Sequence, residues 1–311
     1  MILSASRRTD IPCFYAEWLM NRVRAGYALT RNPMNHAQLA RVPLTPDIVD
    51  CIVFWTKDAA NLLPYLGELE ARDYQYYFQF TLTPYGRPIE PNLRDKTEIE
   101  ETFRALAGRI GSRRVVWRYD PVILGDSFDI SYHRTQFARL CGRLAGCTDT
   151  VTFSFVDLYP KLNRVGWLRA PDAAERAELA GCFAEAARQN GLRITACCEA
   201  DDWTAQGVGR ASCVDRARIE ALLGCRLAVP PDGNQRSGCG CCRSVDIGAY
   251  NTCGNGCVYC YANHSPASAR RNLAAHRPDG ELLLGEVLPG ETAAERQWRS
   301  DAVRQTGLFE L

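Results

Sequence analysis

The decisive stretch of the sequence is "YNTCGNGCVYCYANH", residues 250–264, in which three cysteines stand in a C-x-x-x-C-x-x-C spacing. Those residues are Cys253, Cys257 and Cys260. A structural zinc site uses four ligands, typically from two separated C-x-x-C pairs, so this loop is incomplete for zinc. Three thiolates hold a [4Fe–4S] cluster and leave one iron free. The loop predicts such a cluster, and three buried or zinc-sharing thiols are the alternative.

Cysteines are unusually dense around this loop. The chain has 15 of them, and ten lie between Cys197 and Cys260. The start "MILSASRRTDIP" lacks the layout of a secretory signal peptide, and no apolar run is long enough to span a membrane. We therefore expect a cytoplasmic protein whose cysteines are free thiols or metal ligands and not disulfides.

Short β-branched and aromatic runs alternate with helical patterns along the first 250 residues. This alternation predicts an α/β fold with a parallel sheet and crossover helices. The number of units favours a partial or closed (β/α) barrel similar to a TIM barrel. The expected strands are 2–6, 51–56, 76–83, 115–119, 150–156, 192–197 and 244–249.

Two regions follow from this pattern. Residues 1–265 form the expected barrel, which includes a cysteine-rich segment at 197–260, and residues 266–311 form a C-terminal helical extension. Within the extension, "ETAAERQWRSDAVRQ" at 291–305 predicts a last helix.

Polar side chains follow several of the expected strands. The carboxyl ends of parallel strands share one face of a barrel, and that face carries the chemistry. The alternative is that these residues serve as helix caps and turns. Lys57 stands out because lysine occurs at only three positions among the 37 Lys and Arg residues. The candidates are Arg8, Asp10, Lys57, Arg118 and Asp120.

The three-cysteine loop resembles that of the radical S-adenosylmethionine (SAM) enzymes, including the aromatic Tyr259 before the third cysteine. The resemblance implies that Cys253, Cys257 and Cys260 hold the cluster and that its open iron binds SAM. It also implies that Tyr259 contacts the cofactor. It further implies one-electron cleavage of SAM to a 5′-deoxyadenosyl radical, which abstracts hydrogen from a substrate. An electron donor such as flavodoxin or ferredoxin is then required.

The loop lies unusually late in the chain. In the usual radical SAM barrel it follows the first strand, but only 51 residues follow Cys260 here. The chain therefore looks like a circular permutation of that barrel, in which 244–249 is the cluster strand and 2–6 takes the next place. Chain termini often lie close together, which makes permutation physically reasonable.

The pattern from "SRRTDIP" through "WRYDPV" to "NTCGNGCVYCYAN" resembles a bacterial family of unknown function, whose members are often labelled DNA-repair photolyase-like. The Gly-Gly-Glu segment that usually binds the SAM amino group has no match at "SASRRTD". Arg8, Asp10 and Arg118 are the candidates to replace it.

In the resembled family, recurring cysteines correspond to Cys198, Cys213, Cys239 and Cys241. This implies an auxiliary iron–sulfur cluster or a structural zinc. The alternative is that these small side chains pack like apolar residues. That packing role is the one expected for Cys13, Cys51, Cys141, Cys147 and Cys182.

Three classes of function remain after this reading. The first is a radical SAM enzyme that acts on a small molecule, peptide or nucleotide. The second is a nucleic-acid repair enzyme of the same chemistry, although a net charge of +1 gives no support for nucleic-acid binding. The third is a non-enzymatic cluster-binding sensor or electron carrier, which does not need polar residues at every strand end.

Overall fold

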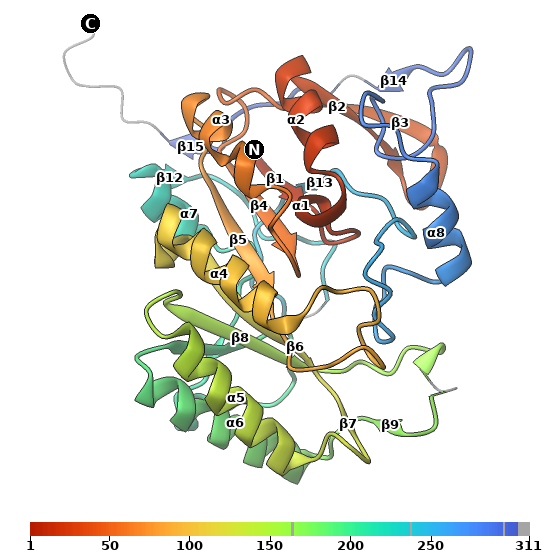
Figure 1. Cartoon of the computed structure of the whole chain (residues 1–311). Coiled ribbons are helices and arrows are strands. Elements are labelled where there is room, and N and C mark those ends of the chain that lie inside the picture. Colours follow the sequence, from red (N-terminus) through yellow and green to blue (C-terminus); the bar gives the residue numbers. More distant parts are fainter. Residues whose placement is uncertain (163–164, 237, 295, 304–311) are drawn as a thin grey trace, which may run out of the picture.

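A computed structural model describes residues 1–162, 165–236, 238–294 and 296–303. Its centre is an eight-stranded sheet in which every neighbouring pair is parallel (Figure 1). In chain order the strands are β1 (Ile2–Ala5), β4 (Cys51–Thr56), β5 (Tyr76–Thr81), β6 (Val115–Val122), β8 (Thr150–Phe155), β10 (Arg193–Ala196), β11 (Gly209–Arg210) and β13 (Val245–Asp246). All seven expected strands are therefore present, and β11 is an addition.

The order of strands across the sheet is β11-β10-β8-β6-β5-β4-β1-β13. Strand β13, the last of these in the chain, lies at one edge and pairs with β1 through Leu3 with Val245 and Ser4 with Asp246. Within the described residues β13 and β11 do not pair, so the sheet is open. The predicted α/β fold with a parallel sheet is confirmed, and of the partial or closed barrel that was expected, the closed form is not what the described residues show. Both edge strands have only two residues, which is too short to close the sheet.

Helices cover one face of this sheet. They are α1 (Ile11–Phe14), α2 (Ala16–Ala25), α3 (Leu66–Ala71), α4 (Lys96–Ile110), α5 (Ile130–Leu144) and α6 (Ala173–Gln189). The helices α4, α5 and α6 begin with Asp95, Asp129 and Asp172, whose carboxylates accept backbone N–H groups of the first turn.

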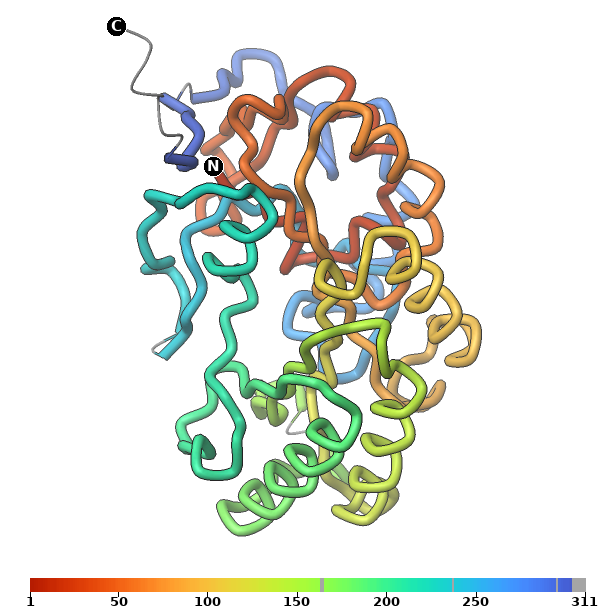
Figure 2. The backbone as a smooth tube through the Cα atoms, turned by 90° about the vertical axis from the view of Figure 1, so that its left-hand side faces the viewer, coloured from red at the N-terminus to blue at the C-terminus, as the bar shows by residue number. Residues whose placement is uncertain are grey.

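Alternation along the strands divides the core into two parts. On β4 and β5, Phe54 and Phe78 belong to the large core beneath the helices, whereas Val53 and Tyr77 point to the other face. That other face is covered by α7 (Arg216–Leu223) and by the cysteine-rich segment around it, seen in teal in Figure 2. Because this segment fills the concave side of the sheet, the core is completed by packing and not by closure of the strands.

The remaining strands are small. A hairpin of β2 (Tyr27–Asn32) and β3 (Asn35–Pro43) is joined by β14 (Ala293–Ala294), β12 (Arg226–Leu227) pairs with β15 (Ala302–Val303), and β7 (Leu124–Gly125) pairs with β9 (Leu168–Arg169). Short 3₁₀ helices occur at η1 (Leu63–Tyr65), η2 (Ser112–Arg114) and η4 (Thr204–Gln206).

The C-terminal extension contains α8 (Pro266–Ala274), but the helix expected at 291–305 is wrong over the described part of that range. Residues 293–294 and 302–303 are short strands instead, and the Trp298 indole donates a hydrogen bond to the Arg41 carbonyl at 2.9 Å. Pairing with distant strands outweighs the local helical pattern. No helix in the described residues is long and apolar enough to cross a membrane.

Candidate functional site

The three-cysteine loop leaves the carboxyl end of β13 at the edge of the sheet. Its ends meet where the Asn251 N–H donates to the Ala262 carbonyl at 2.9 Å. The Asn251 side chain also accepts the N–H groups of His264 and Ser265, at 2.7 and 3.1 Å. Asn251 has a φ of +55°, a left-handed conformation that asparagine tolerates. The loop is therefore a closed unit on its own backbone.

Segment 89–92, which follows β5, is hydrogen-bonded to this loop. The Val258 N–H donates to the Ile89 carbonyl at 3.0 Å, and the Asn92 side chain donates to the Gly254 carbonyl at 2.8 Å. The approach is close at Gly256, where a Cβ would lie 2.8 Å from Asn92 Nδ2 and where φ is +69°. Glycine is required at this position for both reasons.

Asp10 connects two strand ends to the loop. Its buried carboxylate accepts the N–H groups of Cys13 at 3.1 Å and Lys57 at 2.8 Å, and the Asn255 side chain at 3.1 Å. Burial raises the pKa of Asp10 to about 6, although these hydrogen bonds act in the opposite direction. Asp10 thus joins the ends of β1 and β4 to the cysteine loop.

Glu90 is the centre of a buried charged network beside the loop. Its carboxylate accepts Lys57 Nζ at 2.8 Å and the Thr83 hydroxyl at 2.8 Å, and it also accepts Lys96 Nζ and the Tyr259 hydroxyl. Burial acts to raise the pKa of Glu90, but the two lysines outweigh it and lower that pKa to about 2. The predicted cofactor contact Tyr259 therefore has its hydroxyl bound to Glu90.

The two lysines respond differently to this environment. Burial acts to lower the pKa of Lys57, but the charge and hydrogen bond of Glu90, together with the charges of Cys257 and Asp120, outweigh burial and raise that pKa above its usual value. Burial lowers the pKa of Lys96. Burial also raises the pKa of Cys257 to about 12, and the charges of Lys57 and Lys96 act against that rise. The lysines therefore favour the thiolate form.

The predicted strand-end residues divide between two places. Asp10 and Lys57 contact the three-cysteine loop or its supports, and Arg8 lies at its start, with Nη1 3.4 Å from the Gly248 carbonyl oxygen and its guanidinium 5.5 Å from the Tyr250 ring centroid. Arg118 and Asp120 form an ion pair elsewhere. Arg118 Nη1 lies 2.7 Å from the Cys213 sulfur.

That second place contains a group of thiols, which we call the second thiol group. Its members are Cys197, Cys198, Cys213, Cys239 and Cys241. The sulfurs of Cys197 and Cys213 are 3.5 Å apart, and neighbouring thiols along the group interact by hydrogen bonds. The structure therefore brings the four predicted cysteines together and adds Cys197.

Hydrogen bonding and charge favour thiolates at two members of the second thiol group. Hydrogen bonds with Cys198 and Cys213, helped by the charge of Arg118, lower the pKa of Cys197 well below its usual range. Hydrogen bonds with the Cys213 thiol and the Val214 N–H, helped by Arg7, lower the pKa of Cys241 to about 5. At the other three members, hydrogen bonds with neighbouring thiols raise the pKa of Cys198 and Cys213, and burial raises the pKa of Cys239. Thiolate sulfur is the form that binds metals.

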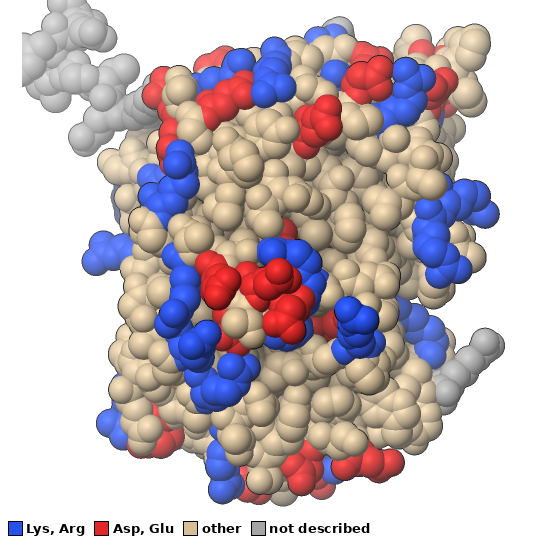
Figure 3. Space-filling view, viewed as in Figure 1, with Lys and Arg blue, Asp and Glu red and all other residues tan. Residues whose placement is uncertain are grey.

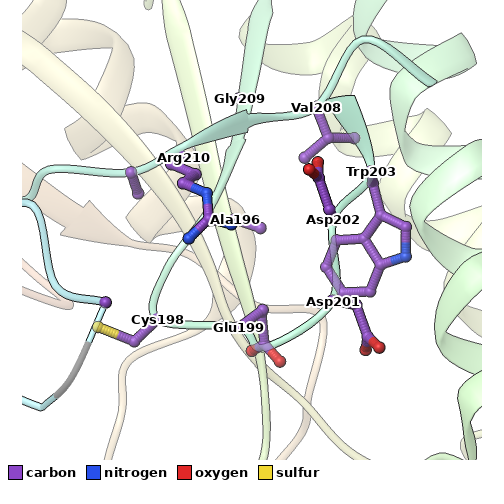
Figure 4. A pocket seen from close by; sticks show the side chains of 11 residues that line it. Ala196, Cys198, Glu199, Asp201, Asp202, Trp203, Val208, Gly209 and Arg210 are labelled. Carbon is purple, nitrogen blue, oxygen red and sulfur yellow. The ribbon is translucent and has the colours of Figure 1, made fainter. Parts of the chain in front are cut away.

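A pocket opens beside this group at the carboxyl ends of β10 and β11 (Figure 4). Cys198 and Glu199 line it together with Trp203 and Arg210. Burial raises the pKa of Glu199 to about 7. Cys198 has a φ of +56°, an uncommon conformation for a residue with a side chain. The second thiol group is therefore reached from this pocket through Cys198.

No group of three or more His, Cys, Asp or Glu side chains is arranged to hold a metal ion in the part of the chain that the structure describes. A tetrahedral zinc site requires sulfurs about 3.8 Å apart, given Zn–S bonds of about 2.3 Å. In a four-iron cluster each thiolate binds a different iron, so the sulfurs lie further apart. As they stand in the described residues, the thiols are thus not arranged around a single ion.

Several buried polar atoms around the three-cysteine loop have no hydrogen-bond partner within the described protein. They are Thr9 Oγ1, Asn255 Oδ1 and Asn263 Oδ1. Within the same described residues Arg7 Nη2 and Trp55 Nε1 are also without a partner, but these two side chains lie on the side of the second thiol group, where the guanidinium groups of Arg7 and Arg118 are 5.2 and 5.5 Å from the Trp55 ring centroid. Buried polar groups are normally paired, so such a concentration calls for an explanation. Together with three thiols on a tightly wrapped loop, the three atoms at the loop fit a site that holds a polar, sulfur-liganded group.

Some site residues escaped the sequence analysis. Glu90, Lys96 and Asn92 come from the segment after β5 or from the start of α4, and Lys161 donates to the carbonyls of Cys260 and Asn263. The rarity of lysine, which drew attention to Lys57, applies equally to Lys96 and Lys161. Cys197 had a signal in the adjacent pair "CC".

These features define a mixed α/β protein with an open parallel sheet and a cysteine-rich site at the carboxyl ends of its strands, where open α/β sheets bind ligands. Residues 2–262 match the family described as "Domain of unknown function (DUF1848)", and the chain belongs to that family. Neither the curated proteins nor the solved structures give a match to the chain.

Proposed function

We propose that this protein is a radical SAM enzyme with a circularly permuted partial barrel. The observation that carries the proposal is the position of the C-x-x-x-C-x-x-C loop, which follows β13 directly at the sheet edge beside β1. In the permuted arrangement the cluster strand is the last in the chain among the strands of the eight-stranded sheet, and it is the first in order across that sheet. The strand order supports this arrangement, because β13 is followed across the sheet by β1, β4, β5 and β6.

The chain's own residues have distinct parts in this proposal. Cys253, Cys257 and Cys260 would hold three irons of a [4Fe–4S] cluster. When bound, the cluster supplies the electron that cleaves SAM to methionine and a 5′-deoxyadenosyl radical. Arg8 is the stronger candidate for the carboxylate of SAM, because the Arg118 guanidinium already contacts Asp120 and Cys213. Asp10 holds the loop in place through Asn255.

The second thiol group is proposed as an auxiliary iron–sulfur site, with zinc as the alternative metal. Its thiols come from three separate segments, and Cys213 is fixed because its carbonyl accepts the Tyr77 hydroxyl at 2.6 Å and the Gln79 side chain at 2.8 Å. Cys197 and Cys213 are too close to bind two different irons of one cluster as they stand. One of them therefore moves on metal binding or is not a ligand.

Anaerobically prepared protein tests both parts of the proposal. Iron, sulfide and zinc are quantified, and 5′-deoxyadenosine is measured after reduction in the presence of SAM. The variant C253A/C257A/C260A is expected to form no 5′-deoxyadenosine while it retains any auxiliary metal. A matched control is C182A, since Cys182 lies on α6, away from both sites. Unchanged SAM cleavage in the triple variant would refute the proposal.

The same experiment separates the alternatives. Iron and sulfide without SAM cleavage would favour an electron carrier or sensor. For a repair enzyme, nucleic acid must bind, and the face seen in Figure 3 intersperses basic with acidic side chains among the described residues. That face offers no continuous basic track for a phosphate backbone. We propose a small-molecule or peptide substrate, because a net charge of +1 gives no support for nucleic-acid binding, and an electron donor of the flavodoxin or ferredoxin type.

A further inference from the structure

All three lysines of the chain lie at the three-cysteine loop. Lys57 and Lys96 both donate to the carboxylate of Glu90, and Lys161 donates to the carbonyls of Cys260 and Asn263. The other basic side chains among the 37 Lys and Arg residues are arginines. Three lysines spread evenly over the surface would not all lie at one site. Their shared location therefore indicates that this site requires lysine for a chemical reason.

The requirement is for buried positive charge. The Glu90 side chain is 0% exposed, and the Lys57 and Lys96 side chains are 13% and 23% exposed. Taking charges out of water is costly even when they are paired. Two ammonium groups and one carboxylate leave this buried network with one net positive charge, adjacent to Cys257.

Lysine suits this position better than arginine. An ammonium is a compact point charge with three donors that point in different directions, whereas a guanidinium is a planar fork that matches two oxygens of one carboxylate. Two ammonium groups fit around the single carboxylate of Glu90, and Lys161 reaches two backbone carbonyls. Lys57 Nζ also lies 5.3 Å from the centroid of the Tyr259 ring, within the loop.

We infer that Lys57, Lys96 and Lys161 are positioning residues that set the electrostatic potential at the three thiolates, so that a bound cluster accepts an electron more readily. The inference rests on the proposed function. Reduction adds one negative charge to a site that already carries three thiolates, and nearby positive charge stabilises that added charge. The electron comes from an external donor, and no bond in the protein is formed or broken.

A redox titration of the reconstituted protein tests the inference without reference to turnover. Lys96→Met removes one positive charge, and we expect the equilibrium constant for one-electron reduction to fall about tenfold, which corresponds to about 59 mV for one electron. Glu90→Gln removes the negative charge, and we expect a shift in the opposite direction. Lys96→Arg keeps the charge and is expected to leave the midpoint potential near that of the wild type.

Opposite shifts of the midpoint potential in Lys96→Met and Glu90→Gln distinguish an effect of charge from an effect of altered structure, because a loosened site would shift the potential of both variants in the same direction. Iron content and far-ultraviolet circular dichroism establish that each variant is folded and loaded. If Glu90→Gln does not fold, the difference in midpoint potential between Lys96→Met and Lys96→Arg shows whether the charge has the effect. Equal potentials in wild type, Lys96→Met and Lys96→Arg would overturn the inference alone. Wild-type protein that holds no four-iron cluster would overturn the proposed function, and the inference with it.

Discussion

The two sulfur sites are built in opposite ways. The three-cysteine loop takes its thiols from eight consecutive residues, Cys253 to Cys260, and lysines surround it. The second thiol group takes its thiols from three separate segments, and arginines face it, with Arg118 at 2.7 Å from the Cys213 sulfur. The first site is therefore a local unit that is docked onto the sheet, whereas the second exists only when distant parts of the chain have come together.

The largest expected difference between the sites is in metal content. Replacing Cys213 and Cys241 by Ala should abolish metal binding at the second thiol group, because it removes two of its central thiols. The four-iron cluster of the three-cysteine loop should remain, since that loop supplies its own ligands. Iron, sulfide and zinc analysis of C213A/C241A beside C253A/C257A/C260A measures this. Loss of both metals in either variant would show that the sites are not independent.

Arg118 offers the next largest effect, on stability. Its side chain is 6% exposed and pairs with Asp120, so Arg118→Ala leaves a carboxylate that is only 24% exposed without its partner. Breaking such a pair typically costs about 3–5 kcal/mol, and we expect a loss of that size in the free energy of unfolding, measured in urea. Arg118→Lys keeps the positive charge but not the planar guanidinium, and its loss of unfolding free energy should be smaller. The midpoint potential of the three-cysteine site should not change.

Asp10 predicts a pH dependence at the three-cysteine loop. Folding raises its pKa from an ordinary 3.8 to about 6. Between these values the folded protein binds the proton and the unfolded chain does not, so stability falls as pH rises. The stability of the wild type relative to Asp10→Asn should therefore fall by about 2.4 kcal/mol between pH 4 and pH 7. Urea unfolding at a series of pH values measures this, and a constant difference would contradict it.

Asn92 gives the smallest effect. Its side chain donates to the Gly254 carbonyl at 2.8 Å in an exposed position, and Asn92→Ala should cost about 0.5–1.5 kcal/mol. Because the bond supports the loop, iron should be lost faster in air than in the wild type. Asn61→Ala removes a similar exposed bond, to the Cys13 carbonyl, and serves as the control. Equal rates of iron loss in the two variants would show that Asn92 does not hold the loop.

The sequence revealed the parts of the fold that depend on local pattern. Strands such as 51–56 and 76–83 were predicted because short β-branched and aromatic runs are visible in the residues themselves, and these strands are buried on both faces. The hairpin of β2 and β3 was missed because β3 is largely exposed and carries no such run. The helix expected at 291–305 was wrong because its residues pair with β3 and β12, which lie far away in the chain.

The candidate sites follow the same rule. The three cysteines of the loop were visible because their spacing is local, and the density of cysteines marked the second thiol group. Glu90 was not visible, because a single glutamate in a loop has no distinguishing pattern until the fold brings Lys57 and Tyr259 to it. Whether the sheet closes could not be predicted from the spacing of the strands in the sequence, because closure depends on the two-residue edge strands β11 and β13.

The pairing of β13 with β1 has a consequence for biosynthesis. Strand β1 is made at the start of this sequence, but its neighbour at the sheet edge comes at Val245–Asp246. At roughly 5–20 residues per second, translation leaves that edge of β1 without its neighbour for roughly 12–50 s. An unpaired strand edge invites association with other chains. The three-cysteine loop, which follows β13, is made later still. Under the proposed function, loading of the metal therefore follows synthesis of β13, and β13 marks the order in which synthesis and cofactor delivery must occur.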